Sequence, residues 1–306
     1  MKKEPILSVK DLGISFSQYT KGLRRRELEV ITNLDIDLYE GEILAVVGSS
    51  GSGKSLLAHA ILGILPDNAT TEGNIIYKGK SLSLKDKEKL RGREIVFIPQ
   101  SVNFLDPLMK VGKQVIGING NKERQKEVFK KYNLDDKVAE MYPFQLSGGM
   151  ARRVLIATAV MNEAKLIIAD EPTPGLNLEL AMETLNNFRE IADNGCGVLL
   201  ITHDVDLALN VADRIAVFYS GTIVEIAKVE DFIKGKDALR HPYSKAFIDA
   251  LPQNKFKELP GYQPYAGNLP KGCLFRDRCS LKTDECYKTI KMRKVRDGEV
   301  RCINAT

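Results

Sequence analysis

The sequence predicts an α/β protein with an antiparallel β subdomain at its N-terminus, a helical subdomain inserted into its core and a small irregular C-terminal extension. Three observations carry this prediction. A continuous apolar run, Ile43–Val47, precedes a glycine-rich loop and a helical stretch, and two similar runs, Leu166–Asp170 and Val198–Thr202, follow later. Continuous apolar runs of this length are typical of parallel strands that are buried on both faces. Such strands, alternating with helices, indicate an α/β fold.

The elements around these strands can be placed in chain order. Strand-forming segments at Ile6–Val9, Ile14–Phe16 and Leu34–Leu38 predict a small antiparallel sheet. Residues from about 101 to 161 are rich in helical patterns and interrupt the alternation of strands and helices, which indicates the inserted subdomain. A further buried strand is predicted at Arg214–Phe218.

Composition places the chain among ordinary globular proteins. It has 306 residues, of which 43% are hydrophobic and 28% charged, enough for a sizeable core. No run approaches the roughly 18 apolar residues of a membrane-spanning helix. The start of the chain lacks the apolar stretch of a secretion signal, so we expect a cytosolic location. The net charge of +5 is too weak to choose between a nucleic acid and an anionic membrane face as a partner.

The composition changes near residue 229, where Lys, Pro, Gly, Tyr and Cys become frequent. We therefore expect one domain over residues 1–229 and an extension over residues 230–306. The extension holds four of the five cysteines. In a reducing compartment such a cluster indicates a metal before disulfides. These cysteines are Cys273, Cys279, Cys286 and Cys302.

The stretch GSSGSGKS, Gly48–Ser55, matches the P-loop pattern completely. Its glycines let the backbone surround a phosphate with N–H groups, Lys54 adds a positive charge and Ser55 offers a hydroxyl to Mg²⁺. A glycine-serine turn that ends in Lys-Ser by chance is the alternative. However, the strand before the loop and the helix after it are the context that the motif requires. The predicted phosphate-binding residues are Gly48, Ser49, Ser50, Gly51, Ser52, Gly53, Lys54 and Ser55.

Two acidic residues, Asp170 and Glu171, end the buried strand in LIIADEPT. Ligands gather at this end of the strands in parallel sheets. Asp170 would hold Mg²⁺ through its water shell, and Glu171 would act as a general base or position the attacking water. Two acids that merely cap the next helix are the alternative, which is less favoured beside a phosphate loop.

Six motifs in the same order resemble those of the ATP-binding cassette family, the nucleotide-binding subunits of ABC transporters. Besides the phosphate loop and the acid pair, they are Gln100 in FIPQ, the stretch LSGGM, the stretch PTPGLN and His203 in LLITHD. In the family these are the Q-loop, the signature, the D-loop and the switch histidine. Alone, a glutamine or a histidine after an apolar run is more often structural. The resemblance covers nearly the whole chain and implies a P-loop ATPase core.

In this family two cassettes pair head to tail, and each signature closes on the γ-phosphate held by the partner's phosphate loop. The resemblance implies this role in trans for Ser147, Gly148 and Gly149, which precede a helical stretch. The free N–H groups and the dipole at the start of a helix favour an anion. ATP would then hold the two subunits together, and its hydrolysis would release them.

The family also implies roles at the chain's own phosphate loop. His203 would contact the γ-phosphate and the attacking water, and Gln100 would link the metal site to the helical subdomain. Phe16 aligns best with the aromatic residue that stacks on adenine, Tyr19 is the alternative, and either could belong to the core instead. The implied catalytic residues are Glu171, His203 and Gln100, and the implied Mg²⁺ site consists of Ser55, Gln100 and Asp170.

The chain departs from the family at two positions. The signature ends in Met150 where Gln is usual, although Met is common in one importer branch. The D-loop ends in Asn177 where Asp is usual, which removes a charge near the dimer seam. Because Glu171 and His203 are both present, we expect hydrolysis rather than a subunit that only binds nucleotide. We expect a different chain as the paired subunit, with an identical one as the alternative.

The stretch HPYSKAFIDALP, His241–Pro252, and the cysteine-containing segment after it resemble the C-terminal extension of the peptide and nickel importer ATPases. That resemblance implies a [4Fe-4S] cluster on the four C-terminal cysteines. Their spacing lacks the close pairs of zinc ribbons and many ferredoxins. Thiols without metal, or with zinc, are the alternatives.

The resemblance therefore implies an ATP- and Mg²⁺-dependent importer subunit, peripheral at the cytoplasmic face of the membrane, that powers uptake of peptides or nickel chelates. Its expected partners are a second cassette subunit, two permeases and, indirectly, an extracytoplasmic binding protein. A soluble cassette ATPase that acts on nucleic acid or ribosomes is the alternative. Such proteins usually carry two cassettes or a long coiled coil. We expect no nucleic-acid partner, because the basic stretches Lys21–Arg26 and Lys78–Arg93 have hardly any stacking aromatics.

Overall fold

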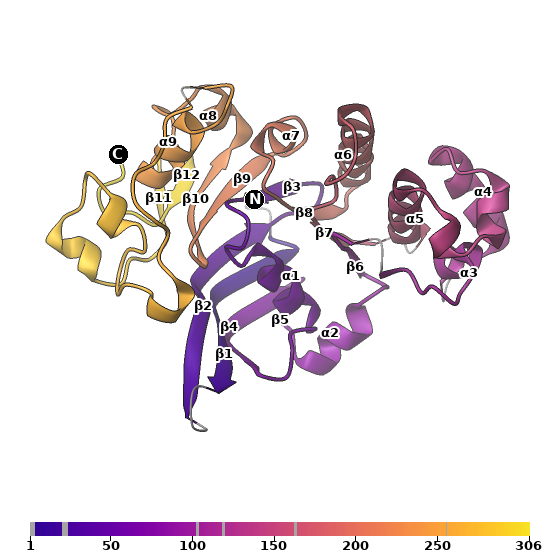
Figure 1. The fold of residues 1–306 in the computed structure, drawn as a ribbon, viewed down its shortest axis with the longest axis horizontal. Helices are drawn as coiled ribbons and strands as arrows, with labels where there is room; N and C mark the ends of the chain where they lie inside the picture. Colours follow the sequence, from indigo (N-terminus) through magenta and orange to yellow (C-terminus); the bar gives the residue numbers. More distant parts are fainter. Residues whose placement is uncertain (1–3, 20–23, 102–103, 118–119, 162–163, 255) are drawn as a thin grey trace.

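The computed structural model contains two sheets with helices packed against them, which confirms the α/β class (Figure 1). Residues 21–23 of the first basic stretch lie outside the described part of the chain. The structure describes residues 4–19, 24–101, 104–117, 120–161, 164–254 and 256–306.

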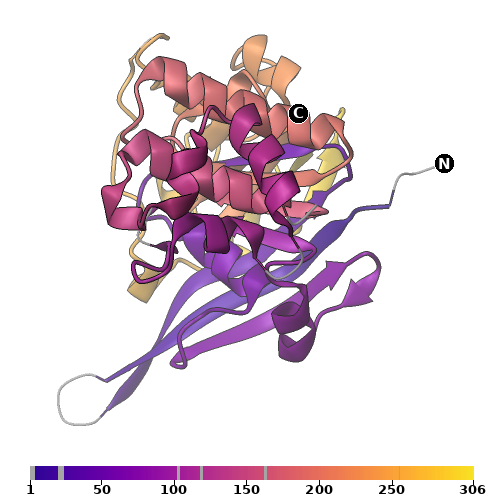
Figure 2. The ribbon, with the colours of Figure 1, turned by 90° about the vertical axis from the view of Figure 1, so that its right-hand side faces the viewer.

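The N-terminal sheet is antiparallel, with the strand order β2-β1-β4-β5. Two of the predicted segments belong to one long strand, β1 (Leu7–Tyr19), which is interrupted by register shifts. Together with β2 (Arg25–Leu38) it forms a hairpin that extends beyond the body of the molecule (Figure 2). The remaining strands are β4 (Ala69–Tyr77) and β5 (Lys80–Ser81).

The central sheet has the order β11-β12-β10-β9-β3-β8-β7-β6. The strands from β9 to β6 are parallel. Both faces are covered, since Ile43 of β3 belongs to one hydrophobic core and the next residue, Leu44, to the other. The strands are β3 (Ile43–Val47), β6 (Ile95–Ile98), β7 (Leu166–Asp170), β8 (Gly197–Thr202), β9 (Arg214–Tyr219), β10 (Thr222–Lys228), β11 (Arg293–Val295) and β12 (Gly298–Val300).

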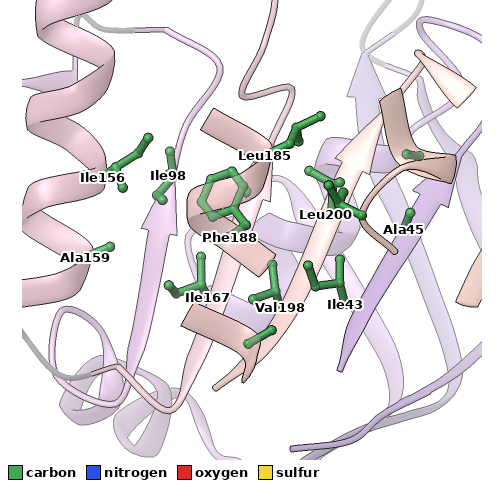
Figure 3. Packing of buried hydrophobic residues seen from close by; sticks show 14 of the residues in the cluster. Ile43, Ala45, Ile98, Ile156, Ala159, Ile167, Leu185, Phe188, Val198 and Leu200 are labelled. Carbon is green, nitrogen blue, oxygen red and sulfur yellow. The ribbon is translucent and has the colours of Figure 1, made fainter. Parts of the chain in front are cut away.

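Helices α1 (Lys54–Leu62) and α6 (Leu178–Asp193) cover opposite faces of this sheet. Leu57 of α1 lies in the core that the central sheet shares with the N-terminal sheet. Phe188 of α6 packs in the other core, close to Ile167 of β7 (Figure 3). The other two helices of this region are α2 (Leu84–Leu90) and α7 (Val205–Leu209).

The helical subdomain lies beside β6 at one end of the molecule (Figure 1). Its longest helix, α5, buries Val154 and Ile156 in the core next to β6 and β7. The insertion that the sequence predicts is therefore present. The elements of the subdomain are α3 (Val111–Ile116), α4 (Lys122–Lys131), η2 (Asp136–Glu140), η3 (Pro143–Gln145) and α5 (Gly148–Met161).

The C-terminal extension is mostly irregular, but it returns to the central sheet. β12 pairs antiparallel with β10, so the hairpin of β11 and β12 enlarges the edge of that sheet. The sequence did not predict these strands, because three residues are too few to show a period. The short helices of the extension are α8 (Val229–Ile233), α9 (Pro242–Asp249), η4 (Ala266–Asn268), η5 (Arg276–Arg278) and η6 (Asp284–Tyr287).

Candidate functional site

The P-loop connects β3 to α1, and its glycines shape it. Gly51 and Gly53 have φ values of +72° and +103°, which L side chains rarely adopt. A Cβ atom added to Gly48 would lie 2.5 Å from the carbonyl oxygen of Phe218 on β9. The loop therefore passes close to β9 and leads into the N-terminus of α1, the end of a helix that favours an anion.

The ammonium group of Lys54 is held by the loop itself. Its Nζ donates hydrogen bonds to the carbonyl oxygens of Gly48 and Ser49, at 2.8 and 2.9 Å. Burial lowers the pKa of Lys54, while the nearby carboxylates of Glu171 and Asp170 oppose this shift. The predicted phosphate-binding lysine and the predicted acid pair thus lie within electrostatic reach of each other.

Parallel strands bring the acid pair and the switch histidine together. Asp170 ends β7 opposite Ile201 of β8, and His203 follows β8, so these residues meet at one edge of the sheet. Glu171 has a φ of +47°, in the left-handed region that residues other than glycine rarely adopt. Its Oε2 lies 2.8 Å from Nδ1 of His203. The structure therefore joins the predicted base directly to the predicted switch residue.

The oxygen atoms near the P-loop fit a magnesium ion and a phosphate. Oδ1 of Asp170 and Oγ of Ser52 are buried and have no hydrogen-bond partner among the described residues. Burial raises the pKa of Asp170, and a hydrogen bond with the Ser55 side chain opposes that shift. A carboxylate oxygen beside a hydroxyl is the kind of hard donor set that Mg²⁺ prefers.

Gln100 lies at the same edge of the sheet, because β6 pairs in parallel with β7. Its side chain is exposed, while its carbonyl oxygen accepts a hydrogen bond from Nη2 of Arg152 at 2.8 Å. Arg152, which is only 4% exposed, also donates to the carbonyl oxygen of Pro99 at 2.8 Å. The position of Arg152 could not be predicted from the sequence, because an arginine in a helix is usually solvated and no local pattern reveals its burial.

The signature residues begin α5 on the surface. Ser147 and Gly148 are exposed, and Oγ of Ser147 accepts a hydrogen bond from the backbone N–H of Met150 at 3.3 Å. A Cβ atom added to Gly148 would meet nothing within 4 Å in the described part of the chain. Figure 1 shows α5 at the end of the molecule and α1 near its centre. The signature, including Gly149, is therefore not part of the chain's own P-loop site.

Phe16 and Tyr19 lie on opposite faces of the β1–β2 hairpin, because they are three residues apart on a regularly paired strand. Phe16 is half-buried and packs against the core beneath the N-terminal sheet. The hydroxyl of the exposed Tyr19 accepts a hydrogen bond from Nη2 of Arg25 at 2.9 Å. The two candidates for stacking on adenine thus face different surroundings.

The four C-terminal cysteines lie near one another. Burial is the main reason that the pKa of the Cys273 thiol is raised to about 11, and the nearby Cys286, Cys302 and Cys279 contribute to the same shift. Even so, no group of three or more His, Cys, Asp or Glu side chains within the described residues is arranged to hold a metal ion. The [4Fe-4S] expectation therefore finds no preformed site.

The P-loop, the acid pair and the histidine at one sheet edge define a P-loop ATPase. The sequence profile of the ABC transporter family matches residues 31–174, and that of the oligopeptide/dipeptide transporter C-terminal region matches residues 224–286. This chain belongs to the ATPase subunits of the ABC transporter family, in the group that carries the oligopeptide/dipeptide C-terminal region. No helix in the described part of the chain is both long and apolar enough to span a membrane.

Known relatives cover most of the chain. The oligopeptide transport ATP-binding protein OppD of Bacillus subtilis is 36% identical, over 90% of this chain and 81% of that protein. The dipeptide transport ATP-binding protein DppD of the same organism is 33% identical, over 96% of this chain and 92% of that protein. A dimeric bacterial ABC transporter cassette, MJ0796, has a TM-score of 0.63 and 26% identity, over 73% of this chain and 98% of that one.

Proposed function

We propose that this chain hydrolyses ATP to power a peptide importer and acts at the cytoplasmic face of the membrane. The observation that carries the proposal is the meeting of the P-loop, Asp170, Glu171 and His203 at one sheet edge. The C-terminal region supports peptides as the transported substrate, because relatives that match this chain are named for oligopeptide and dipeptide transport. The relatives reported above give no such support for nickel.

Residues 48–55 would bind the phosphates of ATP. The backbone N–H groups of the loop and the start of α1 supply partial positive charge, and Lys54 supplies a full one. Ser55, Asp170 and Gln100 would hold Mg²⁺, which would neutralise the charge that develops on the phosphate oxygens. The buried Asp170 oxygen without a hydrogen-bond partner supports this assignment.

Glu171 and His203 would prepare the attacking water. The Glu171 carboxylate is oriented by its contact with Nδ1 of His203 at 2.8 Å, and a positioned carboxylate can accept the proton of a water molecule. His203 would place its ring between this carboxylate and the terminal phosphate. Gln100 would report the state of the site to the helical subdomain, to which Arg152 ties its backbone.

A second cassette subunit would complete the site. Ser147, Gly148 and Gly149 are exposed or half-exposed at the start of α5, where a partner's nucleotide can reach them. The Asn177 side chain accepts a hydrogen bond from the backbone N–H of Leu180 at 2.9 Å and so caps α6, as an aspartate would. We propose a different chain as the partner, together with two permeases and an extracytoplasmic binding protein that delivers the peptide.

We also propose that the C-terminal cysteines hold an iron–sulfur cluster after their side chains reorient. Four thiols that lie close enough to influence one another, all within residues 273–302 and in a segment with little regular structure, support this proposal. Iron and acid-labile sulfide in anaerobically purified protein test it, with about four irons per chain expected. A folded preparation without iron would contradict it.

The substitution Glu171→Gln tests the catalytic assignment. It should leave ATP binding intact, because the P-loop is unchanged, and lower turnover at least about a hundredfold, the range typical of losing a general base. The exposed Glu123 on α4 offers a matched control, and Glu123→Gln should hydrolyse ATP like the wild type. Turnover near the wild-type rate in Glu171→Gln would reject the role.

A further inference from the structure

Part of the C-terminal extension lies against the P-loop. This part, residues 263–268, is called the tail segment below and contains η4. The hydroxyl of Ser49 donates a hydrogen bond to Oε1 of Gln263 at 2.9 Å, although the two residues are 214 positions apart in the chain. Neither family profile contains both residues of this contact, because one matches residues 31–174 and the other matches residues 224–286.

The chain just before the tail segment is held in place by Arg278 of the extension. The guanidinium of Arg278 donates to the carbonyl oxygens of Leu259 and Pro260, each at 2.9 Å. The same group donates to the hydroxyl of Tyr219, at the end of β9, at 3.4 Å. Because β9 also passes next to Gly48, this anchor holds the chain beside the start of the P-loop.

The tail segment, the P-loop and β2 contact one another in pairs. Gln263 of the tail segment contacts Ser49 of the P-loop. A Cβ atom added to Gly53 of the P-loop would lie 3.4 Å from Cγ1 of Val30 on β2. Nη2 of Arg26 on β2 donates a hydrogen bond to the carbonyl oxygen of Gly267, which belongs to the tail segment. Figure 1 shows part of the extension beside β2, and η4 of the tail segment is in contact with that strand.

The tail segment reaches the face of the hairpin that carries Phe16. Phe16 pairs with Leu28, and Gln18 pairs with Arg26, so the side chains of these four residues share one face. Arg26, which holds Gly267, is therefore on the same face as the aromatic residue that is expected at the adenine. The tail segment spans the distance from this face to the phosphate-binding loop.

The tail segment also carries an exposed aromatic ring at this place. Tyr265 is 69% exposed. A Cβ atom added to Gly267 would lie 2.4 Å from Cε1 of Tyr265 and 3.1 Å from Nη2 of Arg26, so ring and guanidinium flank the same glycine. An aromatic side chain left in solvent adds little to folding, and its face is free to stack on a base.

We propose that the tail segment is the nucleoside-side wall of the chain's own nucleotide site. Tyr265 stacks on the base of the nucleotide, together with or in place of Phe16, and Gln263 positions the P-loop through Ser49. The inference rests on the proposed function, since it requires that the P-loop binds a purine nucleotide. It makes nucleotide affinity depend on the C-terminal extension.

Calorimetric titration with ADP and with pyrophosphate, both with Mg²⁺, separates the two halves of the ligand. In the full-length chain, Tyr265→Ala should weaken ADP binding roughly tenfold, the usual effect of losing one stacking ring, and leave pyrophosphate binding unchanged. Tyr265→Phe keeps the ring and should bind ADP like the wild type. Tyr262 is the matched control, because it is a tyrosine close to the tail segment and 95% exposed, and Tyr262→Ala should bind like the wild type.

The outcomes separate this inference from the proposed function. If Tyr265→Ala binds ADP as tightly as the wild type, or loses ADP and pyrophosphate equally, the stacking role is overturned while the ATPase assignment stands. If the wild type binds neither ADP nor pyrophosphate, both the stacking role of Tyr265 and the ATPase assignment are wrong. A selective loss of ADP that Tyr265→Phe restores would support the inference.

Discussion

At the scale of single residues, Glu171, the proposed general base, shows how the fold can fix one carboxylate. A left-handed backbone at a residue with a Cβ atom costs about 1–2 kcal/mol. The conformation persists because the N–H of Glu171 donates to the carbonyl oxygen of Ile201 at 2.8 Å and its carboxylate contacts His203. The end of β8 and the residue that follows it therefore hold both the backbone and the carboxylate of Glu171 in place.

Arg152 links the signature helix to the Q-loop, and its replacement tests that link. Arg152→Lys keeps the charge but loses the fork that reaches the carbonyl oxygens of Pro99 and Gln100 together. A buried carbonyl without a partner costs about 1–3 kcal/mol, so the free energy of unfolding should fall by about 2 kcal/mol. Urea titration measures this change.

The surface residue Arg124 provides the control for Arg152. It pairs with Glu127 at 3.1 Å on the exposed side of α4, and such a pair contributes at most about 0.5 kcal/mol. Arg124→Lys should therefore leave the unfolding curve nearly unchanged. If Arg152→Lys behaved in the same way, Arg152 would not hold the Q-loop.

At the scale of elements, the HPY stretch is the start of α9. Nδ1 of His241 accepts a hydrogen bond from the backbone N–H of Tyr243 at 3.0 Å, and Pro242 occupies the first turn, where no N–H partner is needed. The ring of Tyr243 packs on those of Tyr219 and Phe275. The motif therefore fixes the extension to the end of β9, close to the P-loop.

The buried cap makes stability depend on pH. Burial lowers the pKa of His241 to about 3, below its ordinary value of 6.5, because a charged imidazole there would be desolvated. Between about pH 3 and pH 6.5 the unfolded chain therefore binds a proton at His241 that the folded chain does not bind. The folded state keeps its full stability above pH 6.5 and loses stability as the pH falls toward 3. Between pH 7 and pH 5 the loss should be about 2 kcal/mol.

Replacing His241 isolates this contribution. His241→Asn keeps a side chain that can cap α9 but removes the titrating group. The free energy of unfolding of the variant, measured in urea at pH 7 and pH 5, should fall by about 2 kcal/mol less than that of the wild type. Equal losses in both proteins would show that His241 is not kept neutral by burial.

The buried parallel strands could be predicted from the sequence, and the short or distant contacts could not. Ile43–Val47 and Leu166–Asp170 are strands with the predicted bounds, since burial on both faces leaves an uninterrupted apolar run. The P-loop and the acid pair could also be predicted, because both are recognised from residues next to one another at the ends of those strands. The bond between Ser49 and Gln263 depends on the path of the whole chain, which no local pattern records.

At the scale of the whole molecule, buried contacts cross the domain boundary that we predict near residue 229. Glu225 of β10 is fully buried, and its carboxylate accepts hydrogen bonds from the backbone N–H groups of Arg240 and His241, each at 2.8 Å. Both partners lie in the extension. The cassette and the extension are therefore joined by the hydrogen bonds to the buried Glu225 carboxylate and by the pairing of β10 with β12.

Truncation tests this dependence. A chain that ends at residue 229 should lose about 3 kcal/mol or more of stability or fail to remain soluble, because Glu225 keeps its charge without its partners. A chain that ends at residue 302 retains β12 and both partners and serves as the control. Equal melting temperatures for the chain ending at 229 and the full-length chain would mean that the cassette folds independently.

The proposed sharing of each nucleotide site with a partner subunit agrees with the arrangement of the molecule, since α5 lies at one end and the P-loop near the centre (Figure 1). The most direct test is ATP turnover per subunit as the protein is diluted, for this chain alone and mixed with its second cassette subunit. We predict that turnover per subunit falls toward zero at concentrations where the subunits separate. A constant rate per subunit in a dilute, monomeric sample would contradict the shared site.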